Sequence, residues 1–161
     1  MTEEVTLRDV MDGDLDIFIV QQQDPVALHM AAFTAKEPAN KQVFIAHWSR
    51  IRADDAIMIQ TILYGGQVAG HVLSFEQFGK REVSYWLGRE YWGQGVATRA
   101  LSLFLRLDET RPLFARAAKD NAGSVRVLQK CGYVIAGEDK GYANARGEEV
   151  EEFILRLGAG K

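Results

Sequence analysis

The stretch YWLGREYWGQGVAT, from Tyr85 to Thr98, connects a run typical of a β-strand to an apolar helix. It contains two tryptophans, two tyrosines and three glycines, and Gly93 and Gly95 stand where the helix is expected to begin. A helix N-terminus has free amide groups and a partial positive charge, so a glycine-rich turn leading into one suits a phosphate or pyrophosphate. The stretch therefore predicts either a tight turn without a ligand or a turn that binds phosphate.

A dinucleotide-binding fold is one alternative for this turn. Gly93-x-Gly95-x-x-Thr98 nearly matches the pattern G-x-G-x-x-G, and Asp120 ends the next strand, where a ribose-binding acid would lie. Two features argue against this alternative. The third glycine is replaced by Thr98, and the strand before the turn closes an antiparallel meander rather than opening a parallel βαβ unit.

The remaining sequence predicts a mixed α/β fold of the α+β type. Short links that contain glycine separate three strand-like runs within 56–88, as in an antiparallel meander. The alternation of strand and helix that follows predicts one mixed, mostly antiparallel sheet of about seven strands with helices on both faces. Segment 24–40 has two prolines and no clear period, so we expect a loop or a broken helix there. The expected strands are 5–10, 56–64, 67–77, 81–88, 111–117, 133–143 and 148–157, and the expected helices are 12–23, capped by Asp12 or Asp14, 40–53, 93–109 and 121–132.

Composition narrows the class of protein. The 161 residues are 47% apolar and 25% charged, which is typical of one globular domain of ordinary size. The net charge is −3 and Lys and Arg form no block, which argues against a nucleic-acid surface. The lone Cys131 excludes an internal disulfide and a cysteine-based metal site, and a reducing cytoplasm is the natural setting. The N-terminus does not resemble a signal peptide, and no apolar run reaches the ~18 residues of a membrane span.

Two motifs carry a resemblance to a known family. YWLGREYWGQGVATRAL at 85–101 and NAGSVRVLQKCGY at 121–133 together resemble the GNAT superfamily of acetyl-CoA-dependent N-acyltransferases. Within it, the chain is most similar to the ribosomal-protein N-terminal acetyltransferase type. The resemblance implies one GNAT-like domain over 1–161, with acetyl-CoA as co-substrate and a primary amine as acceptor. Glu90 departs from the general pattern, which has Gln or Arg there, so one expected contact is absent.

The resemblance also implies which residues bind the cofactor. The strand that ends at Trp86 and Leu87 would diverge from its neighbour and bond the pantetheine through free backbone groups. The side chains of Tyr85 and Trp86 would be divided between the core and the cofactor channel. Asn121 would lie near the pantetheine and Ser124 near the sulfur. Asn121 is equally well explained as a helix N-cap, and Ser124 as a hydroxyl that satisfies the first helical turn. The amides that would hold the pyrophosphate belong to Gly93, Gln94, Gly95, Val96 and Ala97.

The implied reaction is direct attack of a neutral amine on the thioester, without a metal. Many superfamily members have a tyrosine four residues after Ser124 to protonate the thiolate, but this position is Leu128, so the resemblance suggests that Ser124 serves instead. Glu82 would be the general base, and a surface glutamate at the start of a strand is the alternative. An α-amino group is neutral more often near pH 7 than a lysine amine, so the lack of an obvious strong base favours an α-amino acceptor.

Several properties stay open at this stage. A non-catalytic module that binds acyl-CoA would carry the same turn as an enzyme. The acceptor would bind to the first two helices, loop 24–39 and the last hairpin, where the pattern is least informative. Homodimers are common in this type, although the sequence does not determine the oligomeric state. His71 lies among apolar strand residues and is expected to be a core histidine held by one hydrogen bond.

Overall fold

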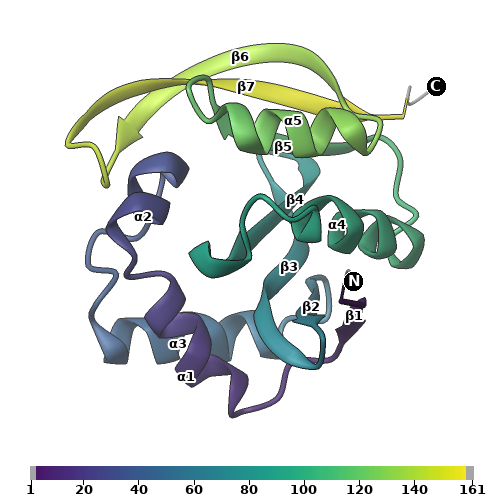
Figure 1. The fold of residues 1–161 in the computed structure, drawn as a ribbon. Coiled ribbons are helices and arrows are strands. Elements are labelled where there is room, and N and C mark those ends of the chain that lie inside the picture. The colour runs from purple at the N-terminus through teal and green to yellow at the C-terminus, as the bar shows by residue number, and fades with distance from the viewer. Residues whose placement is uncertain (1–2, 159–161) are drawn as a thin grey trace.

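The computed structural model describes residues 3–158. Within them it has one seven-stranded sheet, in the order β1-β2-β3-β4-β5-β7-β6, with helices on both faces (Figure 1). This confirms the predicted fold class. The strands are β1 (Val5–Arg8), β2 (Met58–Tyr64), β3 (Gln67–Gln77), β4 (Lys80–Leu87), β5 (Leu113–Ala118), β6 (Val134–Ala143) and β7 (Glu148–Leu157); the helices are α1 (Asp14–Gln21), α2 (Pro25–Ala31), α3 (Lys41–Ala53), the 3-10 turn η1 (Arg89–Tyr91), α4 (Val96–Leu107) and α5 (Ala122–Lys130).

Strands β4 and β5 are the only parallel neighbours among the described strands, and they pair weakly. A single bridge joins them, between Glu82 and Phe114, whereas β5 pairs with β7 along its whole length. Beyond this bridge no residue of β5 pairs with β4, so the C-terminal half of β4 has a partner only on its β3 side. We call this divergence the β4–β5 split.

A large and a smaller core cover the two faces of the sheet, and a third, small cluster joins Ala32, Ala118 and Ala143. The larger core joins α4 and α5 to the strands through fully buried side chains such as Phe104, Leu128 and Leu155. The second core packs Phe18 of α1 and Trp48 of α3 against the opposite face. Side chains alternate along a strand, so Val83, Tyr85 and Leu87 lie on the α4–α5 face, and their β4 neighbours lie on the other.

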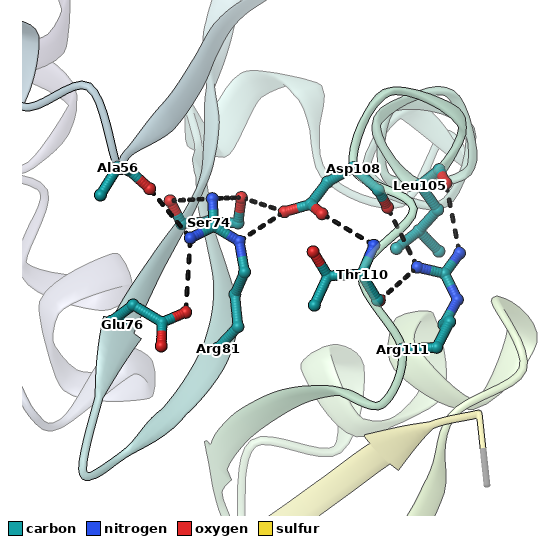
Figure 2. Close-up of polar contacts among 8 residues, drawn as sticks. All are labelled: Ala56, Ser74, Glu76, Arg81, Leu105, Asp108, Thr110 and Arg111. Atoms are coloured by element: carbon teal, nitrogen blue, oxygen red, sulfur yellow. Dashed lines mark hydrogen bonds and ion pairs between the residues drawn. The ribbon is translucent and has the colours of Figure 1, made fainter. Parts of the chain in front are cut away.

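A buried polar network holds the end of α4 against the sheet (Figure 2). The carboxylate of Asp108, which is 3% exposed, accepts hydrogen bonds from the Ser74 hydroxyl at 2.5 Å and from Arg81 Nε at 2.8 Å. Burial alone would raise the pKa of Asp108, but the bonds from Ser74 and Arg81 outweigh it and hold this pKa well below its usual range. The network anchors the C-terminal end of α4 beside the start of β4, which places the N-terminal end of the helix at the far end of that strand.

The structure differs from the sequence prediction near the N-terminus. The predicted cap of the first helix by Asp12 or Asp14 is wrong, because Gly13 is the N-cap and no side chain caps this helix. Asp14 is buried instead and bonds Arg8 at 2.7 Å and the Thr61 hydroxyl at 2.7 Å. Segment 24–40 contains the short helix α2, which the side chain of Asp24 caps.

His71 belongs to the core, as expected, but the predicted hydrogen bond at its ring is not seen at Nδ1. Its ring lies 4.8 Å from that of Phe18 and 4.9 Å from that of Trp48, and Nδ1 is buried without a partner among the described residues. Burial lowers the pKa of His71 to about 3, so the ring is neutral near pH 7. No helix within residues 3–158 is both long and apolar enough to cross a bilayer.

The Asp108 network generates a stability prediction. Asp108→Asn leaves Arg81 without its buried carboxylate, so we expect the free energy of unfolding at pH 7 to fall by about 3 kcal/mol in urea titrations. Because folding lowers the pKa of Asp108, the advantage of the wild-type protein is present above about pH 4 and shrinks as the pH falls below that.

Glu76→Gln is the matched control for this prediction. Glu76 contacts the same Arg81 at 3.5 Å, but its side chain is 59% exposed, so we expect a loss below about 1 kcal/mol. Equal losses for the two variants would contradict the assigned role of the buried carboxylate.

Candidate functional site

The turn between β4 and α4 presents unpaired amides. Gly93 and Gly95 have φ angles of 75° and 76°, and Gly95 is the N-cap of α4 without any side-chain cap. None of the backbone amides of residues 93–98 has a hydrogen-bond acceptor within the described part of the chain. The amides and the helix dipole together make this end of α4 suited to an anion.

Both glycines are required by the backbone, and both face open space. A φ near +75° strains any residue with a Cβ, which explains why glycine occupies positions 93 and 95. A Cβ added at either position would meet no protein atom within 4 Å. The space beside the turn is therefore free for a ligand to approach the backbone closely.

The register of β4 decides which backbone groups face the split. Gly88 N donates to Ala69 O, so the alternation of an antiparallel ladder directs the Trp86 amide and carbonyl towards His71 of β3. The corresponding groups of Tyr85 and Leu87 point to the β5 side, where no residue pairs with them. The end of β4 that was predicted to diverge from its neighbour does diverge. However, the groups that face the split belong to Tyr85 and Leu87 rather than to Trp86.

The two tryptophans of the motif anchor this strand end. The Trp86 indole donates to the carbonyl of Gln21 at 3.2 Å, which ties β4 to the end of α1. The Trp92 indole donates to the carbonyl of Leu87 at 2.9 Å and so occupies one of the groups that face the split. A carbonyl oxygen has two lone pairs, so the Leu87 carbonyl can accept a second donor.

Helix α5 places a hydroxyl over the split. Asn121 is the N-cap of α5, and its Oδ1 accepts from Ser124 N at 3.2 Å. The structure therefore supports the capping interpretation of Asn121, and the side-chain nitrogen keeps no acceptor within residues 3–158. The Ser124 hydroxyl lies 3.1 Å from the hydroxyl of Tyr85, which reaches it from β4.

The sequence prediction left Tyr85 between the core and the cofactor channel and gave its hydroxyl no partner. Its hydroxyl end is buried, which raises the pKa of Tyr85 to about 12 although the bond with Ser124 opposes the rise. The alternation of side chains along β4 was the available signal, because it places Tyr85 on the same sheet face as α5. Only the packing of α5 shows which residue the hydroxyl meets.

Glu82 lies on the opposite face of the sheet from Ser124. The alternative that Glu82 is a surface residue is wrong, because it is 5% exposed and contacts Arg116 at 3.4 Å. Arg116 also bonds Glu152 at 3.2 Å and Asp139 at 3.0 Å, so one guanidinium serves three carboxylates. Burial raises the pKa of Glu152, and Arg116 opposes the rise. This face of the split thus carries an excess of acidic groups around a single cation.

The segments expected to bind an acceptor enclose a hollow of about 260 Å³ between α2, the loop after it and the β6–β7 hairpin. Pro25 and Leu28 line one side, and Asn144 of the hairpin lines the other. Arg146 ties the hairpin to the site, since it bonds both carboxylate oxygens of Asp120, beside Asn121.

A larger hollow of about 350 Å³ lies between β1 and α4, away from the split, and is lined by helix residues from Thr98 to Arg106. Within residues 3–158, no group of three or more His, Cys, Asp or Glu side chains is arranged to hold a metal ion.

Comparison with known proteins gives a consistent result. The sequence model of the family described as "Acetyltransferase (GNAT) domain" matches residues 4–134. The uncharacterized N-acetyltransferase p20 of Bacillus licheniformis is 23% identical, over 97% of this chain and 93% of its own.

Solved structures that share the fold include RimJ and MccE. RimJ of Mycobacterium smegmatis, in complex with CoA-disulfide, is 19% identical with a TM-score of 0.79 over 96% of this chain and 82% of its own. The microcin C7 self-immunity acetyltransferase MccE, in complex with acetyl-CoA and AMP, is 18% identical with a TM-score of 0.76, over 97% and 93%. At this identity the structures establish the fold and not the acceptor.

Proposed function

The chain belongs to the GNAT acetyltransferase family, and we propose that it moves an acetyl group from acetyl-CoA to a primary amine of a peptide N-terminus or a small molecule. The observation that carries the proposal is the β4–β5 split, which opens beside the unpaired amides at the start of α4. Acetyl-CoA carries a pyrophosphate, and a pantetheine chain with amide groups leads from it to the thioester sulfur. The unpaired amides of the turn suit the pyrophosphate, and the split suits the pantetheine amides.

The cofactor is proposed to bind along the split. The amides from Gly93 to Ala97 take the pyrophosphate, because they are free and lie at the positive end of the α4 dipole. The backbone groups of Tyr85 and Leu87 bond the pantetheine amides in the manner of an added strand. The thioester then lies near Ser124, where α5 closes over the end of β4. Trp86 contributes the backbone that orients its two neighbours and not a bond of its own to the cofactor.

The proposed chemistry is direct acyl transfer. The amine nitrogen forms a bond to the thioester carbon and gives up one proton, the C–S bond breaks, and its electron pair stays on sulfur. The sulfur leaves as coenzyme A and gains one proton, so the net proton transfer is from nitrogen to sulfur. Ser124 donates a hydrogen bond to the departing sulfur, which is where negative charge develops.

Glu82 is proposed to assist proton removal from the amine. It lies on the sheet face opposite Ser124. An amine that approaches from the Glu82 face would meet Glu82, and a thiolate that leaves on the other face would meet Ser124. Its carboxylate contacts Arg116 at 3.4 Å and accepts from Gln77 at 3.2 Å, and these two contacts fix its orientation. The surplus of carboxylates around Arg116 would favour an acceptor that carries positive charge.

The proposed cofactor turn generates a prediction for Gly95. In Gly95→Val, the side chain points into the open space beside the turn and the backbone is strained, so we expect the Kd for coenzyme A to rise at least about tenfold in isothermal titration calorimetry. Gly66→Val is the matched control, because Gly66 has a φ of 81° and equally open surroundings in the β2–β3 turn. An unchanged Kd in Gly95→Val, or an equal rise in both variants, would contradict the proposed turn.

The proposed chemistry generates a prediction for Ser124. Ser124→Ala removes the donor to the departing sulfur, so we expect kcat to fall about 10- to 100-fold without complete loss, because a thiolate is a good leaving group. The measurement is release of the coenzyme A thiol from acetyl-CoA in the presence of short peptides with free N-termini, spermidine or putrescine.

Ser102→Ala, an exposed serine of α4, is the control and should keep wild-type turnover. Normal turnover in Ser124→Ala would remove Ser124 from the mechanism. Binding of acetyl-CoA with no thiol release for any amine would contradict catalysis and indicate a binding module.

A further inference from the structure

A hydrogen bond joins β4 and α5 at the β4–β5 split. The hydroxyl of Tyr85, on β4, lies 3.1 Å from that of Ser124, on α5, so the pair connects the two structural elements between which the thioester is proposed to lie. Within residues 3–158 the Ser124 hydroxyl has no other hydrogen-bond partner. It therefore does not bond the carbonyl one turn earlier, which is the usual partner of a helical serine.

We propose that Tyr85 is a positioning residue that donates its hydrogen bond to Ser124 Oγ and leaves the Ser124 hydrogen free to point at the departing sulfur. This inference rests on the function proposed above for Ser124. A hydroxyl has one hydrogen to donate, so while the two hydroxyls stay bonded Ser124 donates to the sulfur only if it accepts from Tyr85. The reverse direction would use the Ser124 hydrogen on the tyrosine.

The surroundings of the pair favour this direction. Ser124 Oγ is the one hydrogen-bond partner of the Tyr85 hydroxyl among residues 3–158, so it is the acceptor to which Tyr85 can donate. The Ser124 amide is already bonded to Asn121, which holds the first turn of α5 in place. The two hydroxyls thus form a short chain directed from the interior towards the split.

No other tyrosine or serine of this region offers the same bond. Leu128, one turn further along α5, is apolar and fully buried. The Tyr133 hydroxyl follows α5 but is buried without any partner within the described part of the chain. The second hydroxyl of the site therefore comes from β4. It does not come from the α5 position, Leu128, at which many members of the superfamily have a tyrosine.

The role leaves the proton balance of the transfer unchanged. The acceptor nitrogen loses one proton, the C–S electron pair stays on sulfur, and the sulfur gains one proton. Tyr85 keeps its proton throughout and acts by orienting Ser124. Its loss should therefore lower kcat and leave the binding of acetyl-CoA unchanged.

The decisive experiment measures the pKa of the coenzyme A thiol in the complex, from the ultraviolet absorbance of its thiolate. A donor directed at the sulfur stabilises the thiolate, so we expect Tyr85→Phe to raise this pKa by about 0.5 to 1, and Ser124→Ala to raise it at least as much. Tyr133→Phe is the matched control, because it removes a buried hydroxyl that has no partner, and it should leave the thiol pKa unchanged.

Turnover provides the second measurement, with the amine that the wild-type protein uses fastest among the peptide and polyamine probes. We expect Tyr85→Phe to lower kcat about tenfold, with the KM for acetyl-CoA unchanged within about twofold. Because Tyr85 acts through Ser124, the double variant should be no slower than Ser124→Ala alone. Losses that multiply in the double variant, or a Tyr85→Phe protein that matches Tyr133→Phe in thiol pKa, would overturn the inference.

These outcomes separate the inference from the function on which it rests. If Ser124→Ala raises the thiol pKa and slows transfer while Tyr85→Phe does neither, the proposed function stands and the role of Tyr85 is wrong. If the wild-type protein fails to bind coenzyme A, the proposed function itself is wrong and the inference falls with it. If coenzyme A binds but no amine is acetylated, catalysis is wrong, and the thiol pKa still decides whether Tyr85 orients Ser124.

Discussion

The single bridge between Glu82 and Phe114 is the constraint on which the site depends. In a regular sheet the backbone groups of Tyr85 and Leu87 would be paired with β5. Because the two strands diverge after one bridge, these groups have no strand partner and become available to a ligand. The divergence has a cost in lost sheet bonds, which the extensive pairing of β5 with β7 and the core beneath α4 and α5 offset.

The two ends of α4 differ in whether their polar groups have partners. The Asp108 network secures the C-terminal end of the helix through buried, charge-assisted hydrogen bonds. The N-terminal end has no capping side chain, and two glycines keep its amides exposed. The C-terminal end of α4 therefore stabilises the fold, and its N-terminal end is suited to bind a ligand. The sheet then separates two groups of polar residues, with Tyr85 and Ser124 on one face and Glu82 with Arg116 on the other.

Local sequence determined much of this arrangement. The glycine turn, the strand before it and the helix after it follow from residue types with strong backbone preferences, and the order of strands follows from the meander. The split was predicted only through the family resemblance, and the Tyr85–Ser124 bond and the burial of Glu82 by Arg116 were not predicted at all. Each depends on register between segments more than 30 residues apart, as the separation of 39 between Tyr85 and Ser124 illustrates. The predicted cap of the first helix failed partly for the same reason, since Asp14 bonds Thr61, 47 residues away, in addition to the nearby Arg8.

Amide hydrogen exchange, measured residue by residue by NMR with and without acetyl-CoA, tests the central claim most directly. Saturating acetyl-CoA should slow exchange at the amides from Gly93 to Ala97 and at Tyr85 and Leu87, because these groups are unpaired in the free protein and bonded in the complex. Exchange in the β2–β3 turn at Gly65 and Gly66 should not change. Ligand binding that leaves the turn and the end of β4 as fast as before would contradict the account.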